Sequence, residues 1–76
     1  KTYLMSTYLE TIRAGLDRVL LLYDLKHLDA ALEIANLTED LINFGKKNSL
    51  PENRQVNELS KTLFKWRVRI IFEKDS

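Results

Sequence analysis

Apolar residues recur every three or four positions along the first part of the chain. The stripe comprises Met5, Leu9, Ile12, Leu16, Val19 and Tyr23. Since residues at this spacing share one face of an α-helix, the pattern predicts a helix from about Thr2 to Leu22. Gly15 lies inside it, where glycine costs about 1 kcal/mol relative to alanine. It indicates either a close approach by a neighbouring helix or a bend.

A second helix is predicted after Asp24. The Asp24 carboxylate can accept amide hydrogens of a first helical turn, as N-cap residues do. The apolar face of this helix comprises Leu25, Leu28, Ala31, Leu32 and Ala35. Asn36 is the next expected break.

A third, shorter helix is predicted beyond this break. Asn36 or Thr38 can cap it, and Glu39 completes a variant of the capping box. The helix is expected to bury Leu41, Ile42 or Phe44. Gly45 suits the left-handed position at its C-terminus. In the alternative interpretation, the second and third helices form one kinked helix.

The last predicted helix runs from Pro51 to about Glu73, after a loop over residues 46–50. Proline suits a first helical turn, where its missing N–H has no role, and Ser49 begins a second capping-box pattern. The core stripe of this helix is Val56, Leu59, Leu63, Trp66 and Ile70. No strand-like alternation occurs. The chain is therefore expected to be all-α, a compact bundle of four or five helices forming one domain over residues 1–76.

Four apolar residues of the last helix lie off its core stripe. They are Phe64, Val68, Ile71 and Phe72. Either they pack against the N-terminal half of the first helix, or they form an apolar patch of the kind that marks a protein partner.

Composition narrows the class of protein. The chain has no cysteine, so it forms neither a disulfide nor a thiolate metal site. Its longest apolar run, Val19 to Tyr23, is too short to span a bilayer. No signal peptide is visible at Lys1, and we expect the chain to be a fragment of a longer protein.

Charge is distributed unevenly along the chain. Residues 1–45 carry four Lys or Arg and seven Asp or Glu, whereas residues 46–76 carry eight and four. The net charge of +1 therefore hides a basic C-terminal part that can attract acidic partners.

No catalytic or metal-binding constellation is found. His27 is the single histidine, and Asp24 and Asp29 do not share a helix face with it well. No serine has the context of a nucleophile. We therefore expect neither an enzyme nor a cofactor or small-molecule substrate.

Basic residues of the last helix raise the alternative of a weak nucleic-acid binder. They are Lys61, Lys65, Arg67, Arg69 and Lys74. They spread over several faces, so direct nucleic-acid binding is not the preferred interpretation.

The segment from Asp24 to Arg67 resembles the N-terminal domain of transcription elongation factor TFIIS, the Leu–Trp superfamily. The resemblance involves residues 25–32, residues 37–47 with their basic end, and residues 56–67 with Leu63 and Trp66. Within that superfamily the chain is similar to the integrase-binding domain of lens-epithelium-derived growth factor and related PWWP-containing chromatin proteins. The similar residues are Tyr23-Asp24 at one corner and Leu50 in the second loop.

This resemblance implies a non-catalytic, nuclear adaptor that binds short disordered motifs of transcription-elongation or chromatin factors. Such motifs carry an apolar residue among acidic ones. The implied peptide-binding residues are Tyr23, Asp24, Leu50, Lys46, Lys47 and Arg54. For these six residues to form one binding site, both corners must lie at the same end of the bundle. The alternative function is a structural assembly module that uses the Phe64, Val68, Ile71 and Phe72 face. We expect a monomer in isolation for the adaptor and self-association for the assembly module.

Overall fold

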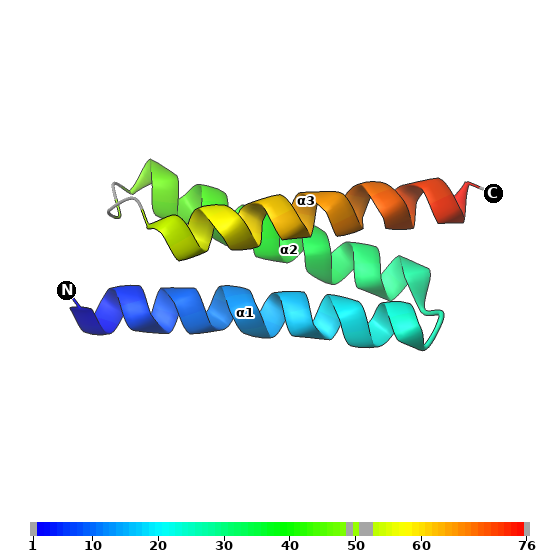
Figure 1. Ribbon diagram of the computed structural model, residues 1–76, viewed down its shortest axis with the longest axis horizontal. Helices are drawn as coiled ribbons and strands as arrows, with labels where there is room; N and C mark the ends of the chain where they lie inside the picture. The colour runs from blue at the N-terminus through cyan, green and yellow to red at the C-terminus, as the bar shows by residue number, and fades with distance from the viewer. Residues whose placement is uncertain (1, 49, 51–52, 76) are drawn as a thin grey trace.

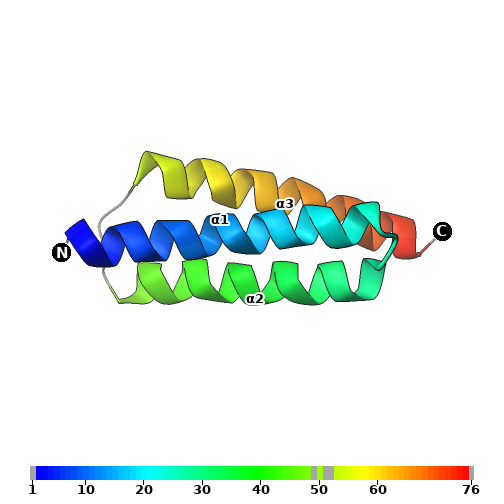
Figure 2. The same cartoon turned by 90° about the horizontal axis from the view of Figure 1, so that it is seen from below.

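Three antiparallel helices form an elongated bundle of 43 × 18 × 16 Å (Figure 1). The computed structural model describes residues 2–48, 50 and 53–75, with side chains from residue 6 onward. The helices are α1 (Thr2–Asp24), α2 (Leu28–Lys47) and α3 (Arg54–Lys74). Seen along the perpendicular direction, α1 lies in front, with α2 and α3 on either side of it (Figure 2). The described residues contain no strand, and the all-α prediction is confirmed.

The predicted number of helices is wrong, because α2 continues through the expected break. Asn36 and Thr38 lie inside this helix and cap nothing. The Thr38 hydroxyl donates to the Ile34 carbonyl at 2.8 Å, which satisfies it within the helix. Burial of Ala35 and Ile42 on the same face of α2 favours continuity over a local cap. The alternative of one helix in place of two is therefore the one observed.

The corner between α1 and α2 is formed by Lys26 rather than by a cap at Asp24. Asp24 is the last residue of α1, and His27 occupies the N-cap position of α2 without a side-chain cap bond. Lys26 has a left-handed φ of 66°. The amides of Lys26 and His27 donate to the carbonyls of Tyr23 (3.0 Å) and Leu22 (2.9 Å), which is the Schellman pattern.

Gly45 does not end α2, contrary to the prediction. It is a buried residue of the last turns, and the helix continues to Lys47. Asn48 is the C-cap, and both its backbone amide (3.0 Å) and its side-chain amide (2.8 Å) donate to the Phe44 carbonyl. Lys46 and Lys47 lie in this last turn, where the negative end of the helix dipole attracts cations and stabilises the helix.

Helix α3 begins later than predicted, with Asn53 as its N-cap. The Asn53 side-chain oxygen accepts from the amides of Gln55 (2.7 Å) and Val56 (3.2 Å). The predicted roles of Pro51 and Ser49 lie outside the described residues.

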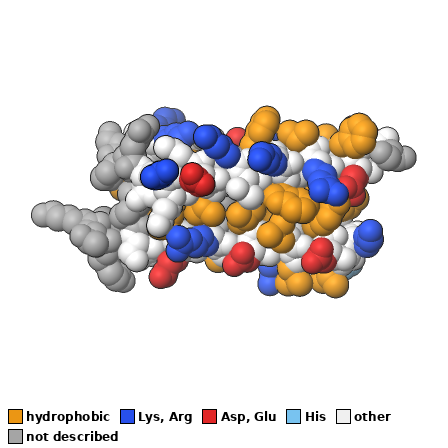
Figure 3. Space-filling view, in the orientation of Figure 1, with side chains coloured by type: hydrophobic (Ala, Val, Ile, Leu, Met, Phe, Trp, Pro, Cys, Tyr) orange, Lys and Arg blue, Asp and Glu red, His pale blue; other side chains and the backbone are white. Residues whose placement is uncertain are grey.

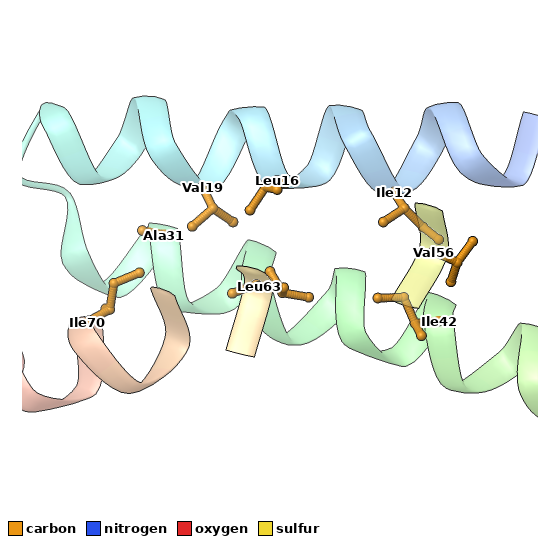
Figure 4. Packing of buried hydrophobic residues seen from close by; sticks show 9 residues of the cluster. Ile12, Leu16, Val19, Ala31, Ile42, Val56, Leu63 and Ile70 are labelled. Carbon is orange, nitrogen blue, oxygen red and sulfur yellow. The ribbon is translucent and has the colours of Figure 1, made fainter. Parts of the chain in front are cut away.

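All three helices contribute to the core (Figure 4). The buried apolar residues are Ile12, Leu16, Val19, Ala31, Ala35, Ile42, Val56, Leu63 and Ile70. They include the centres of the predicted stripes of α1 and α3. Leu9, Tyr23, Leu59 and Trp66 of the same stripes are half-buried at the margin of the core. Leu25, predicted on the apolar face of α2, is exposed because it lies in the turn.

Gly15 marks a close approach between α1 and α2. A Cβ atom added there would lie 3.0 Å from Thr38 Cγ2 and 3.2 Å from Thr38 Cβ, and would overlap Thr38 Oγ1. Glycine at this position therefore allows the buried Thr38 to pack directly against the backbone of α1. Of the two interpretations of Gly15, the close approach is the one observed.

Candidate functional site

The two corners proposed to share a pocket lie at opposite ends of the bundle (Figure 1). Tyr23 and Asp24 end α1, whereas Leu50 lies in the loop between α2 and α3. In an antiparallel bundle, consecutive corners alternate between the two ends. Four helices would have placed the first and third corners together; the continuous α2 removes one reversal. The prediction of one pocket lined by all three residues is therefore wrong.

At the α1–α2 end, Tyr23 takes part in a cluster that joins α1 to α3. Its hydroxyl donates to Glu73 Oε2 at 2.6 Å, and its ring meets Trp66 edge-on at 4.9 Å between centroids. The Arg69 guanidinium lies 5.7 Å from the Tyr23 ring centroid and 3.2 Å from the Glu73 carboxylate. Tyr23 therefore has partners within the chain. Asp24 beside it is exposed.

The hydrogen bond from Tyr23 lowers the pKa of Glu73, and Arg69 lowers it further. The same bond raises the pKa of the Tyr23 hydroxyl. A carboxyl group with a depressed folded-state pKa stabilises the fold above its unfolded pKa. That contribution is lost as pH falls through the folded value.

Glu73→Gln is therefore expected to destabilise the domain near pH 7 and to have less effect in acid, below the folded-state pKa of Glu73. Urea denaturation of both proteins at the two pH values measures this difference. Glu58→Gln is the control, since Glu58 lies on the same helix and forms no ion pair within the described residues. An equal loss at both pH values would show that the Glu73 carboxylate has no stabilising partner.

At the opposite end, an apolar pocket of about 400 Å³ opens between α1, α2 and the loop that follows. It is lined by Thr7, Tyr8, Thr11, Leu41, Phe44, Asn48 and Leu50. Phe44 is 62% exposed although its neighbours Ile42 and Gly45 are buried, so its ring forms an open wall of this pocket.

Backbone contacts hold the other two walls in place. The Tyr8 hydroxyl donates to the Ile42 carbonyl at 3.0 Å, and burial raises the pKa of Tyr8. The Tyr8 ring lies directly over Gly45, where an added Cβ would come within 2.8 Å of the ring carbon Cε1. The Leu50 amide donates to the Gly45 carbonyl at 3.0 Å. Gly45 therefore positions both Tyr8 and Leu50.

A smaller, polar notch of about 190 Å³ adjoins this pocket. Tyr8 and Leu50 line both cavities, and the notch adds Lys46, Asn53 and Asn57. An apolar side chain in the larger pocket would thus have donor groups beside it for a neighbouring carboxylate.

The predicted cations gather at this same end. Lys46 and Lys47 lie in the last turn of α2, and Arg54 is the first residue of α3. All three are exposed. Of the predicted peptide-binding residues, four therefore belong to the Leu50 end, and Tyr23 and Asp24 do not.

Sequence reasoning missed Tyr8 and Phe44 as pocket residues. Tyr8 precedes the core residue Ile12 by four positions, so its spacing alone does not distinguish it from a residue of the core stripe. Phe44 was expected as one candidate for burial. The signal that identifies them is Gly45, whose missing side chain admits the Tyr8 ring between two helices.

A metal site is not supported in the described part of the chain. Within the described part of the chain, no three His, Cys, Asp or Glu side chains are placed to hold a metal ion. His27 is exposed at the start of α2. None of the described helices combines the length and the apolar composition that crossing a membrane requires.

Comparisons of the chain with known protein families, curated proteins and solved structures gave no match. Its function must therefore be inferred from the fold and from the geometry of its surface.

Proposed function

We propose that this domain is a non-catalytic adaptor that binds short disordered peptides at the Leu50 end of the bundle. The observation that carries the proposal is the pocket walled by Tyr8, Phe44 and Leu50, with the polar notch beside it. One apolar side chain of a peptide would fill the pocket, and an adjacent carboxylate would meet Lys46 and the notch amides.

Charge supports the acidic character of this peptide. Lys46, Lys47 and Arg54 are exposed at this end of the bundle and form no ion pair within the described residues. Of the three, Lys46 lines the notch. Exposed cations of this kind accelerate association and add modest affinity. A disordered segment also loses conformational entropy on binding, so the affinity is expected to be moderate.

The nuclear and transcriptional side of the proposal is supported by the sequence resemblance alone. On that basis the partners are disordered motifs of transcription-elongation or chromatin factors. The domain would bind them without catalysis and without a cofactor.

A peptide with one Phe among acidic residues tests the pocket. Leu50→Ala is expected to weaken its binding about 5- to 30-fold, because it removes about 1–2 kcal/mol of apolar contact. Titration of the labelled protein, followed by amide chemical shifts, measures the affinity. Amides around Gly45 and Leu50 are expected to shift most, and added salt to weaken binding.

Leu25→Ala is the matched control, since it truncates an exposed leucine at the opposite end. Asp24→Asn is expected to bind the peptide normally. A second peptide with Ser in place of Phe should lose most of the affinity. Shifts that gather at Tyr23 and Asp24 instead, or unchanged binding by Leu50→Ala, would refute the pocket assignment.

The alternative function, an assembly module, is favoured by a separate observation. Phe64, Val68, Ile71 and Phe72 are 60%, 50%, 42% and 74% exposed, so they are not buried against α1. Figure 3 shows apolar side chains along the outer edge of the second half of α3.

Nucleic-acid binding receives less support from the same helix. Three of its cations form ion pairs within the chain: Arg67 with Glu39, Arg69 with Glu73, and Lys74 with Asp29. Lys61 and Lys65 are the two remaining candidates of the five proposed to touch phosphates.

A further inference from the structure

The exposed face of α3 has a pattern that is symmetric about Val68. Phe64 and Phe72 lie four residues before and after it, and Lys61 and Asp75 lie seven residues before and after it. These spacings keep all five side chains on one helix face. Asp75 stays in helical register, since the C-cap has φ −81° and ψ −8°.

We propose that this face binds a second copy of the chain, with the two α3 helices antiparallel and a two-fold axis passing at Val68. In such an isologous pair, residues at equal distances before and after Val68 meet across the axis. Phe64 then contacts Phe72 of the other copy, and Val68 contacts its own counterpart.

Charge complementarity selects the antiparallel direction. It places each Lys61 opposite an Asp75, which gives two ion pairs at the ends of the apolar strip. A parallel pair would place Lys61 against Lys61 and Lys65 against Lys65, and like charges at that distance repel.

The flanking residues fit the same arrangement. Ile71 and Lys65 lie three residues after and before Val68, so Ile71 would cover the aliphatic stem of Lys65. Arg67 and Arg69, the neighbours of Val68, are held by Glu39 and Glu73 of their own chain. Neither guanidinium therefore has to be buried unpaired at the axis.

The apolar area of this face of α3 limits the affinity between the two copies. From the exposed fractions of its four apolar side chains, this face offers about 400 Å² of apolar surface per copy. The four apolar side chains alone therefore supply about half of the roughly 800 Å² of total surface that each partner contributes to a stable complex. A weak dimer is therefore expected, with a dissociation constant of about 100 µM.

Cysteine crosslinking tests the axis directly, because the chain has no cysteine of its own. Val68→Cys is expected to form a disulfide-linked dimer under mild oxidation, well above the background of Asp17→Cys on the exposed face of α1. Lys61→Cys alone should not link to itself, whereas a mixture of Lys61→Cys and Asp75→Cys should link. Equal linkage of Val68→Cys and Asp17→Cys would overturn the pairing, and self-linkage of Lys61→Cys would overturn its direction.

Sedimentation of charge variants tests the ion pairs independently. Lys61→Asp is expected to raise the dissociation constant several-fold, and the double exchange Lys61→Asp with Asp75→Lys to restore it. These positions are exposed, so circular dichroism should show unchanged folding. A wild-type chain that remains monomeric at several hundred µM, about the range in which such a dimer forms, would overturn the proposal and assign the face to a different protein.

Discussion

Replacement of Leu63 by alanine is expected to lower the free energy of unfolding by about 2–5 kcal/mol. Leu63 is 2% exposed and lies among core residues of all three helices (Figure 4). Its truncation removes apolar contacts and leaves a cavity that rigid helices can close only in part. The total stability expected for a domain of this length is about 4–11 kcal/mol. If the stability lies at the lower end of this range, the variant is expected to be partly unfolded.

Phe64→Ala is the matched control for this experiment. It removes a larger side chain from the adjacent position, but Phe64 is exposed, so the loss should be within about 0.5 kcal/mol. Urea denaturation at low micromolar protein concentration compares the two without a contribution from self-association. A larger effect at Phe64 than at Leu63 would mean that α3 turns a different face toward the core.

The core stripes were predictable from sequence because spacing alone determines them. A residue three or four positions from Leu63 shares its face wherever α3 begins, so an error in the start of the helix leaves the stripe unchanged. Ile12, Leu16 and Val19 were identified in α1 for the same reason.

The expected break at Asn36 and the helix caps were predicted wrongly, because local signals compete with packing that the sequence does not display. Asn36 and Thr38 have the chemistry of caps, yet the continuous buried face of α2 incorporates both. The left-handed residue occurs at Lys26, where no glycine marks it. One wrong break then altered the number of chain reversals and placed Tyr23 and Leu50 at the same end.

Four of the six proposed peptide-binding residues still lie at one end of the bundle despite that error. Leu50 and the nearby cations were identified from the loop and from the basic end of α2, both of which are local features. Tyr8 comes from a different helix, and only the packing of its ring over Gly45 brings it to the pocket. Such a contact depends on how α1 and α2 are placed against each other.

The other close approach between these helices leads to the second large expected effect. Gly15→Ala is expected to destabilise the domain by up to about 2 kcal/mol, although alanine is the better helix former by about 1 kcal/mol. The new methyl group would meet Thr38, which is buried and whose hydroxyl is bonded to the Ile34 carbonyl. Relief requires either breaking that bond or moving the two helices apart, and overpacking of this kind costs about 1–3 kcal/mol.

A double-mutant cycle isolates the Gly15–Thr38 contact from other effects of the substitution. Thr38→Ala removes the two atoms nearest the new methyl group, so Gly15→Ala with Thr38→Ala should recover most of the loss, with a coupling of about 1 kcal/mol or more. Ala14→Gly at the neighbouring exposed position should show the ordinary preference for alanine, a loss of about 1 kcal/mol. Thermal or urea unfolding of Gly15→Ala, Thr38→Ala, the double variant and Ala14→Gly, each beside the wild type, measures these values. If Gly15→Ala instead stabilises the domain as at an ordinary helix position, α1 and α2 do not pack backbone against side chain at this point.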